Sequence, residues 1–170
     1  MLAAMQIARS AGVPVSLDLN LRIKNWGLAG AKLEAVRAAV NLADYVLGGG
    51  VEELMPLAAA ADIHGALQAI SDGRRTVVAR LGAAGAEALD ASGAHSTAPG
   101  ITVQVQSLVG AGDAFNGGFI AALTGGRSLH DALRWGNAVA ALKVRGTPRR
   151  RGLPNQADVE ELLARQHPSR

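Results

Sequence analysis

The sequence has 170 residues, of which 49% are hydrophobic and 3% aromatic, and it carries a net charge of +3. This length and hydrophobicity allow one buried core, which excludes an intrinsically disordered chain. Cysteine is absent, so disulfides and thiolate zinc sites are excluded and a cytoplasmic location is expected. Because no apolar run is long enough to span a membrane and the start does not read as a secretory signal, we expect no membrane partner.

Helix-like and strand-like patterns alternate along the first half of the chain. The predicted helices, rich in Ala and Leu at helical spacing, cover residues 2–11, 28–43, 51–60 and 63–71. The predicted strands are short apolar runs at residues 13–17, 45–47 and 76–81. This alternation predicts an α/β fold in which helices cover a parallel sheet.

The second half begins with two further apolar runs, residues 86–89 and 101–105, separated by a Gly-, Ser- and Pro-rich stretch. We expect both to be antiparallel strands at a sheet edge. The helices predicted after them are residues 112–123, a helix capped by Ser128, and a terminal helix opened by Pro154 and Asn155. No internal repeat or long linker divides the chain, which predicts a single domain over residues 1–170.

The excess positive charge lies late in the chain, at Arg145, Arg149, Arg150 and Arg151. A solvated basic loop is the simplest interpretation, and a phosphate contact by one of these arginines is the alternative. No aromatic residues are interleaved with them to stack on bases, so we expect no nucleic-acid partner.

Residues 109–115, Val-Gly-Ala-Gly-Asp-Ala-Phe, stand between a strand candidate and the start of a helix. Two glycines around an alanine allow a tight turn that brings amide N–H groups together, and the positive end of the helix dipole points to the same place. The segment therefore predicts an anion site. Asp113 would repel phosphate there unless it has a task, such as taking the proton of an attacking hydroxyl. The alternative is that Asp113 only caps the helix.

The segment GAGDAFNGGFIAAL, residues 110–123, resembles the C-terminal motif of the ribokinase or PfkB-type carbohydrate kinases. The resemblance implies a ribokinase-like three-layer fold, with a mainly parallel sheet flanked by helices, whose N-terminal part is missing. It also implies that Gly110, Ala111 and Gly112 form an anion hole for the transferred phosphate and that Asp113 is the catalytic base. ATP and Mg²⁺ are the implied cofactors.

The resemblance extends through LHDALRWGNAVAALKVRGT, residues 129–147, where the family places the helix and loop that cover the adenine. It implies Asn137 and Ala140 as nucleotide-binding residues. The segment RLGAAG resembles the glycine turn beside the nucleotide, which adds Gly82 and Gly85 to this set. We expect these residues to form the nucleotide-binding portion of a carbohydrate kinase.

Residues 16–22, SLDLNLR, with Trp26 after them, are similar to the D-x-N-x-R motif and Trp of fructokinase-like and 2-keto-3-deoxygluconate kinase-like members. The resemblance implies Asp18, Asn20 and Arg22 as substrate-binding residues. Arg22 can hold a carboxylate or phosphate with two parallel hydrogen bonds. The resemblance implies 2-keto-3-deoxygluconate or fructose as the substrate. The alternative is a salt bridge between Arg22 and Asp18 at the strand end.

The segment GVEEL, residues 50–54, stands where the family carries N-x-x-E, a motif associated with magnesium and phosphate binding. Glu53 matches its glutamate, which implies that Glu53 holds magnesium through water. Gly50 stands in place of the asparagine.

The residues before the phosphate loop also depart from the family, because Ser107, Leu108 and Val109 replace its usual D-T-x. This change removes an expected contact with a monovalent cation. The resemblance covers nearly the whole chain, yet it begins midway through the family's fold. A truncated gene product, a fragment or a misplaced start would each account for this.

Four histidines are scattered along the chain without metal spacing or an evident acid/base partner, and we expect all of them at the surface: His64, His95, His130 and His167.

The leading hypothesis is an ATP-dependent kinase that moves a phosphate to a primary hydroxyl of a sugar or sugar acid. Its expected partners are a nucleotide and a small sugar, with a homodimer left open. The alternative is a truncated, non-catalytic nucleotide-binding remnant, which the changes at Ser107 and Gly50 favour. A dinucleotide-binding oxidoreductase domain is disfavoured, because no G-x-G-x-x-G turn follows the first strand.

Overall fold

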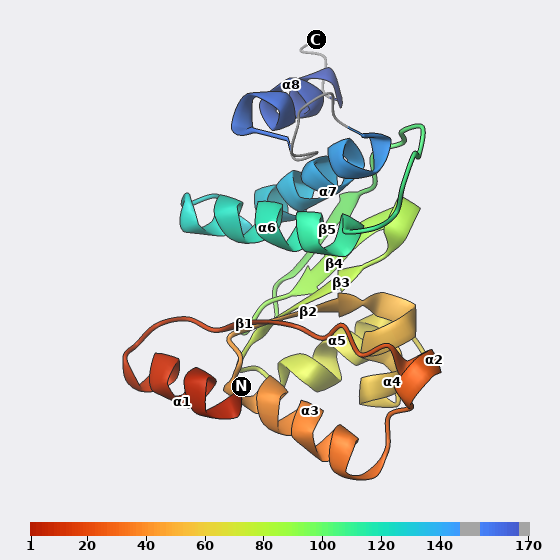
Figure 1. Ribbon diagram of the computed structural model, residues 1–170. Coiled ribbons are helices and arrows are strands. Elements are labelled where there is room, and N and C mark those ends of the chain that lie inside the picture. Colours follow the sequence, from red (N-terminus) through yellow and green to blue (C-terminus); the bar gives the residue numbers. More distant parts are fainter. Residues whose placement is uncertain (147–153, 167–170) are drawn as a thin grey trace. The chain divides into compact units, whose positions relative to one another are not determined.

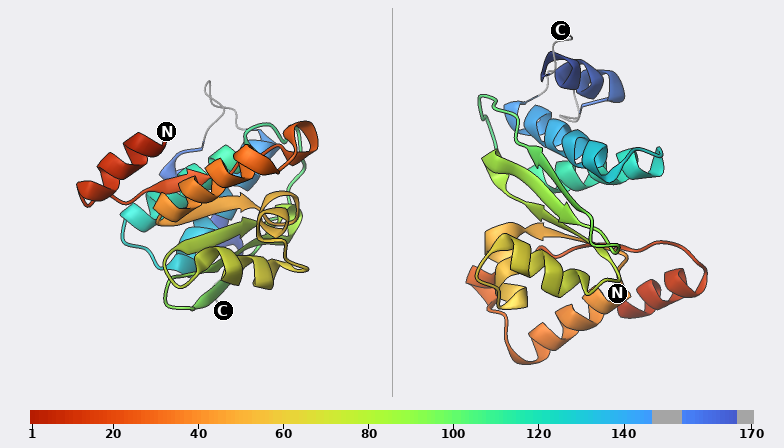
Figure 2. Two further views of the ribbon diagram at one scale, coloured as in Figure 1. Left: turned by 90° about the horizontal axis from the view of Figure 1, so that it is seen from below. Right: turned by 180° about the vertical axis from the view of Figure 1, so that it is seen from behind.

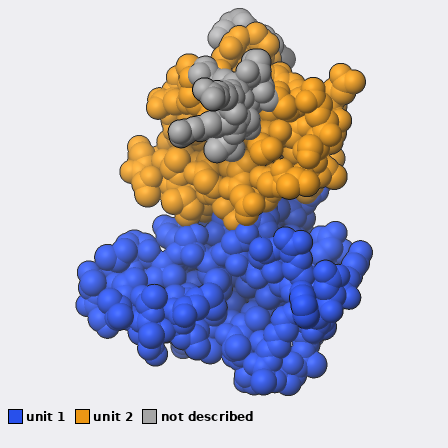
Figure 3. Space-filling view, in the orientation of Figure 1, with its two compact units in different colours: residues 1–81, 87–95 blue, residues 82–86, 96–170 orange. Residues whose placement is uncertain are grey.

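The computed structural model describes residues 1–146 and 154–166 of the chain (Figure 1). They fall into two compact units, coloured separately in Figure 3. The first unit comprises residues 1–81 and 87–95, and the second comprises residues 82–86 and the described part of 96–170. That the whole chain acts as a single domain stays a prediction.

The first unit is built on three parallel strands: β1 (Ser16–Asp18), β2 (Tyr45–Gly49) and β3 (Thr76–Arg80). Its helices are α1 (Leu2–Ser10), α2 (Ile23–Trp26), α3 (Gly30–Leu42), the π-helical turn η1 (Gly50–Leu54), α4 (Met55–Ala58) and α5 (Ile63–Ser71). Helices α1, α3, α4 and α5 lie on one side of these strands (Figure 1). The predicted alternation of helices and parallel strands is confirmed.

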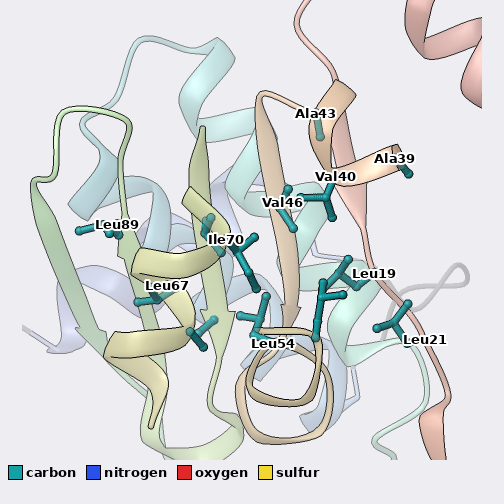
Figure 4. Packing of buried hydrophobic residues seen from close by; sticks show 14 of the residues in the cluster. Leu19, Leu21, Ala39, Val40, Ala43, Val46, Leu54, Leu67, Ile70 and Leu89 are labelled. Atoms are coloured by element: carbon teal, nitrogen blue, oxygen red, sulfur yellow. The ribbon is translucent and has the colours of Figure 1, made fainter. Parts of the chain in front are cut away.

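The core of the first unit lies between these strands and helices (Figure 4). Val46 of β2 is in register with Val77 of β3, and both side chains are fully buried. Leu54 and Leu67 reach the same cluster from η1 and α5. Short β-branched and Leu-rich runs can fill such a core because central parallel strands are buried.

A hairpin follows β3 and consists of β4 (Gly85–Leu89) and β5 (His95–Pro99), which completes a five-stranded mixed sheet in the order β1-β2-β3-β4-β5. The expected strand at residues 101–105 is wrong, because these residues are not in a strand. The turn between β4 and β5, which begins at Asp90, sets where β5 starts. Asp90 Oδ1 accepts hydrogen bonds from the backbone amides of Ser92 and Ala94, and Asp90 N donates to Ala94 O. Pairing with β4 therefore begins at His95, whatever the hydrophobicity of the later residues.

The second unit contains the 3₁₀ turn η2 (Gly82–Ala84) and the helices α6 (Ala111–Thr124), α7 (Leu129–Arg145) and α8 (Gln156–Gln166). Helices α6 and α7 lie side by side (Figures 1 and 2). Two glycines allow this close approach, since a Cβ at Gly118 would stand 2.6 Å from Val139 Cγ2 and a Cβ at Gly136 would stand 2.9 Å from Phe115 Cε2. Part of the predicted GGF motif is thus explained by helix packing.

The predicted helix starts of the second unit are confirmed. Ser128 Oγ accepts a hydrogen bond from the amide of Asp131 at the start of α7. At the start of α8, Asn155 and Asp158 each accept a hydrogen bond from the other's backbone amide. Within the described residues, no helix has the length and apolar character that crossing a membrane requires.

Candidate active site

The predicted phosphate loop leads into α6 with a left-handed residue at its start. Gly110, the residue before the helix, has a φ of +76°, a conformation that glycine adopts without strain. Gly110 O accepts the amide hydrogen bond of Ala114, so the helix begins at once. No side chain caps this end. Ala111 N donates to Leu108 O at 3.1 Å. The amides of Gly112 and Asp113 have no partner within the helix and can face an anion, as expected for a helix N-terminus.

Asp113 is the third residue of α6 and its side chain is exposed. The capping alternative is not what the structure shows, because Gly110 occupies the cap position and no side-chain bond is made there. Among the described residues, no hydrogen bond or ion pair engages the Asp113 carboxylate. Its role as a catalytic base stays a prediction, and the carboxylate has the freedom that such a base requires.

A cavity of about 750 Å³ in the second unit begins at this loop. Gly110 and Asp113 line it together with Trp135 and Lys143 of α7 and the first residues of α8. A Cβ at Gly110 would stand 3.6 Å from Lys143 Cε, so the lysine side chain runs beside the start of α6. Among the described residues, the cavity thus combines apolar walls, the start of α6, the Asp113 carboxylate and two cationic side chains, those of Lys143 and Arg127. This combination suits a phosphorylated ligand.

Lys143 is a candidate that sequence reasoning missed. It is half-buried, and no ion pair with it occurs among the described residues. Arg127, which also lines the cavity, is engaged: its guanidinium lies 4.1 Å from the Trp135 ring centroid and 3.9 Å from Glu160 Oε1. The sequence carries no signal for Lys143, because only the packing of α7 against α6 brings its side chain to Gly110.

The four predicted nucleotide-binding residues also lie in the second unit. Gly85 has a φ of +105°, and a Cβ there would stand 2.1 Å from the carbonyl oxygen of Ala98. Asn137 is buried, and its Nδ2 donates to the carbonyls of Ala98 (3.0 Å) and Pro99 (3.1 Å). The structure therefore brings Gly85 and Asn137 together at the end of β5. Close backbone packing explains the glycine, and the two hydrogen bonds explain the asparagine. A nucleotide contact by either residue stays a prediction.

The other two predicted nucleotide-binding residues, Gly82 and Ala140, have fewer contacts that explain their identity. Gly82 begins η2 with a φ of +59° and has open space where a Cβ would stand. Ala140 is half-buried on α7. Their nucleotide contacts also stay predictions.

The predicted substrate residues lie in the first unit, where β1 ends. Asp18 Oδ1 is 2.9 Å from Nη2 of Arg80, so its partner is Arg80 and not Arg22. The alternative of an Arg22–Asp18 salt bridge is therefore not what the structure shows. Arg22 Nε instead donates to Asn20 Oδ1 at 3.1 Å, and both side chains are exposed. Trp26, at the end of α2, is also exposed.

Glu53, the predicted magnesium residue, is occupied by other groups. Its Oε1 accepts the amide hydrogen bond of Leu21 at 2.5 Å, and its Oε2 accepts that of Gly49 at 2.7 Å. Oε2 also lies 3.5 Å from the Arg80 guanidinium. Donors on both oxygens and an adjacent cation do not fit a direct magnesium ligand. The expected contact with magnesium through water stays a prediction. Among the described residues, no group of three or more His, Asp or Glu side chains is arranged to hold a metal.

The glycine that replaces the family's asparagine has close apolar neighbours. A Cβ at Gly50 would stand 2.6 Å from Ile63 Cδ1 and 2.7 Å from Leu81 Cδ2. These two apolar side chains fill the space that an asparagine would need. Both atoms are the ends of flexible side chains, so a larger residue at position 50 would require these two side chains to move.

The histidines are at the surface as expected where the structure describes them, namely His64, His95 and His130. The structure adds an acidic partner that the sequence did not make evident, because His95 Nε2 lies 3.3 Å from Glu87 Oε2 across the hairpin. His64 packs edge-on against His95, with 5.7 Å between ring centroids. The hairpin register creates these neighbours, which spacing along the chain does not reveal. His167 and the arginines at 149–151 lie outside the described residues.

Comparison with known proteins decides the family. A model of the pfkB family of carbohydrate kinases matches residues 1–156. The chain belongs to the pfkB carbohydrate kinase family. The resemblance and the ribokinase-like fold expected from the motifs are thereby confirmed.

Three pfkB-family relatives illustrate the range of similarity. The chain is 27% identical to a 5-dehydro-2-deoxygluconokinase of Bacillus licheniformis, covering 97% of this chain and 51% of the relative. It is 29% identical to a 2-dehydro-3-deoxygluconokinase of Bacillus subtilis, covering 95% and 50%. A fructokinase of Vibrio cholerae O395, solved with fructose, ADP and calcium ion, aligns with a TM-score of 0.82 and 34% identity, covering 95% and 54%. The chain thus spans about half the length of these relatives.

Proposed function

We propose that this chain carries the nucleotide-binding and phosphoryl-transfer portion of an ATP-dependent kinase that phosphorylates a primary hydroxyl of a sugar or sugar acid. The observation that supports it most is the start of α6. There an uncapped helix end, the exposed Asp113 and the neighbouring Lys143 line one cavity of about 750 Å³. Family membership supplies the class of reaction.

Each group at this end of α6 has a proposed task. The amides of Gly110, Ala111 and Gly112 donate hydrogen bonds to the oxygens of the transferred phosphoryl group, where negative charge is concentrated. The Asp113 carboxylate takes the proton of the attacking hydroxyl. Lys143 adds positive charge beside the same phosphates, which offsets the repulsion between them and Asp113.

The remaining residues bind the two substrates in this proposal. Gly82, Gly85, Asn137 and Ala140 form the nucleotide side, with ATP and Mg²⁺ as the ligands. Because the described residues do not fit a direct metal site, the tasks above are assigned without the metal.

The sugar side is formed by Asp18, Asn20 and Arg22. The exposed guanidinium of Arg22 favours an acidic sugar such as 2-keto-3-deoxygluconate over a neutral one. Two relatives that act on deoxygluconate-type substrates by name agree with this choice. A cytoplasmic location and a homodimer stay predictions.

A second candidate function is a nucleotide-binding remnant without catalysis. The observations that favour it are Ser107 and Gly50, which stand in place of the aspartate and asparagine of the family motifs. The two candidates agree on nucleotide binding and differ on phosphoryl transfer.

Calorimetry and a turnover assay test the proposal together. We expect the chain to bind ATP with Mg²⁺ more tightly than NAD, because the loop forms a phosphate cradle without a ribose-reading acid after the first strand. Release of ADP in the presence of 2-keto-3-deoxygluconate or fructose supports the kinase. ATP binding without turnover supports the remnant. Equal affinity for ATP and NAD overturns both.

A further inference from the structure

The turn at residues 20–22 has an unusual backbone. Asn20 has a φ of 39° and Arg22 a φ of 50°, in the left-handed region that residues with side chains rarely adopt. Between them Leu21 is buried, with 7% of its surface exposed. A backbone of this kind persists only where its surroundings fix it firmly. The two exposed polar side chains of the turn are those proposed to bind the sugar.

Charged side chains hold Leu21 from both sides. Glu53 Oε1 accepts the Leu21 amide hydrogen bond at 2.5 Å. Lys32 Nζ donates to the Leu21 carbonyl at 3.1 Å and to the Gly27 carbonyl at 2.9 Å. The single residue between the two left-handed positions thus has its donor and its acceptor bound by opposite charges. Such charge-assisted bonds are stronger than neutral ones.

Glu53 is itself held in place. Gly49 N donates to its Oε2 at 2.7 Å, and the Arg80 guanidinium lies 3.5 Å away from the same oxygen. Arg80 also bonds Asp18 at 2.9 Å, so it links the end of β1 to η1. The side chains of Arg80 and Glu53 are only 16% and 12% exposed. Arg80 therefore neutralises a half-buried carboxylate and fixes its direction.

We infer that Glu53, Arg80 and Lys32 form a latch that fixes the Asn20–Arg22 turn and so positions the sugar-binding side chains. Glu53 is in this account a positioning residue and not a direct magnesium ligand. The part of the inference that concerns the sugar rests on the proposed function. The part that concerns the turn depends only on the contacts of Leu21.

Amide hydrogen exchange at Leu21, followed by NMR on the full chain, tests the latch directly. Glu53→Gln keeps the side-chain shape but removes the charge, so the Leu21 amide should exchange about 10-fold faster or more. Arg80→Met should have the same effect, and Arg80→Lys should restore part of the protection. Glu34→Gln, in an exposed ion pair on α3, is the matched control and should leave Leu21 unchanged.

Affinity for ATP with Mg²⁺ separates the latch from a metal site. The latch predicts that Glu53→Gln binds ATP with Mg²⁺ as the unchanged chain does. A metal ligand at Glu53 predicts the opposite pattern, with weakened ATP binding and a protected Leu21 amide. That pattern, or a Leu21 amide unaffected by Glu53→Gln, overturns the inference. If Glu53→Gln does not fold, Lys32→Met gives the same test from the carbonyl side of Leu21.

Affinity for 2-keto-3-deoxygluconate tests the positioning role. Glu53→Gln and Lys32→Met should weaken it about 10-fold or more while ATP affinity and melting temperature hold. A general loss of structure would instead lower the melting temperature and both affinities. If the unchanged chain fails to bind the sugar acid while the substitutions still speed up exchange of the Leu21 amide, the proposed substrate is wrong and the latch is supported. If variants show faster exchange of the Leu21 amide but an unchanged affinity for the sugar acid, that result overturns the positioning role.

Discussion

Two of the three carboxylates predicted for the site, Glu53 in the first unit and Asp113 in the second, have opposite surroundings. Glu53 accepts two backbone hydrogen bonds and lies beside a guanidinium. Asp113 is exposed at an uncapped helix end and has no bonded partner among the described residues. A carboxylate engaged on both oxygens holds structure, whereas one without partners can exchange a proton. Residue type and motif alone do not distinguish these two roles.

The largest effect expected on stability is that of Arg80→Met. It leaves Glu53 and Asp18 without their cation in a half-buried place, which should lower the free energy of unfolding by about 2–4 kcal/mol. Urea denaturation followed by circular dichroism measures the loss. Arg74→Met is the control, since Arg74 and its partner Asp72 are 76% and 64% exposed and such pairs contribute less than about 1 kcal/mol. Equal losses of unfolding free energy in the two variants would contradict a special role for the Arg80 ion pairs.

Asn137→Ala tests whether the buried side-chain amide of Asn137 in the second unit stabilises the fold. Its Nδ2 donates to the carbonyls of Ala98 and Pro99, and leaving these carbonyls unsatisfied should cost about 1–3 kcal/mol. The same denaturation experiment measures it. A variant of unchanged stability that no longer binds ATP would show that Asn137 serves the nucleotide alone.

Lys143→Met removes the cation beside the phosphate loop. We expect ATP to bind about 10-fold more weakly, which corresponds to about 1.4 kcal/mol, while the thermal stability changes little. Arg145→Met is the matched control, since Arg145 is the exposed residue that ends α7. Calorimetry compares the two. Equal effects on ATP affinity would mean that net charge, and not the position of Lys143, attracts the nucleotide.

The smallest effect is expected at a carboxylate outside the predicted site, Asp90 in the hairpin turn. The Ser92 side-chain hydrogen bond, with help from backbone amides, holds the pKa of Asp90 below its ordinary value. A lowered folded-state pKa stabilises the hairpin above the pKa of the unfolded chain, and this contribution is lost as the pH falls through the folded-state pKa. Ser92→Ala should therefore lower the melting temperature slightly at neutral pH and not at strongly acidic pH. A difference that persists in acid would contradict this.

The sequence predicts the local structure of this chain better than its contacts. Helix periodicity, the Ser128 cap and the alternating strands follow from neighbouring residues, and the structure confirms them. The strand expected at residues 101–105 failed because the Asp90 turn, and not hydrophobicity, sets where β5 begins. The anion loop and Asp113 could be predicted because a compact motif contains them, and their roles stay predictions.

Contacts between distant residues were missed. Leu21 is 32 residues from Glu53, and Asp18 is 62 residues from Arg80. Lys143 reaches Gly110 only through helix packing. A motif therefore predicted Glu53 as a functional residue but could not show that its oxygens are already bonded. Only the tertiary structure separates a positioning carboxylate from an open one.

The central claim, that the open carboxylate of Asp113 is the catalytic base, is tested most directly by the rate of phosphoryl transfer from ATP in the Asp113→Asn chain. Asparagine keeps the shape of the side chain but cannot take the hydroxyl proton, so the rate should fall about 10²–10⁴-fold. ATP affinity should hold or rise, because a negative charge beside the phosphates is removed. A variant that retains more than about a tenth of the original rate would contradict the account.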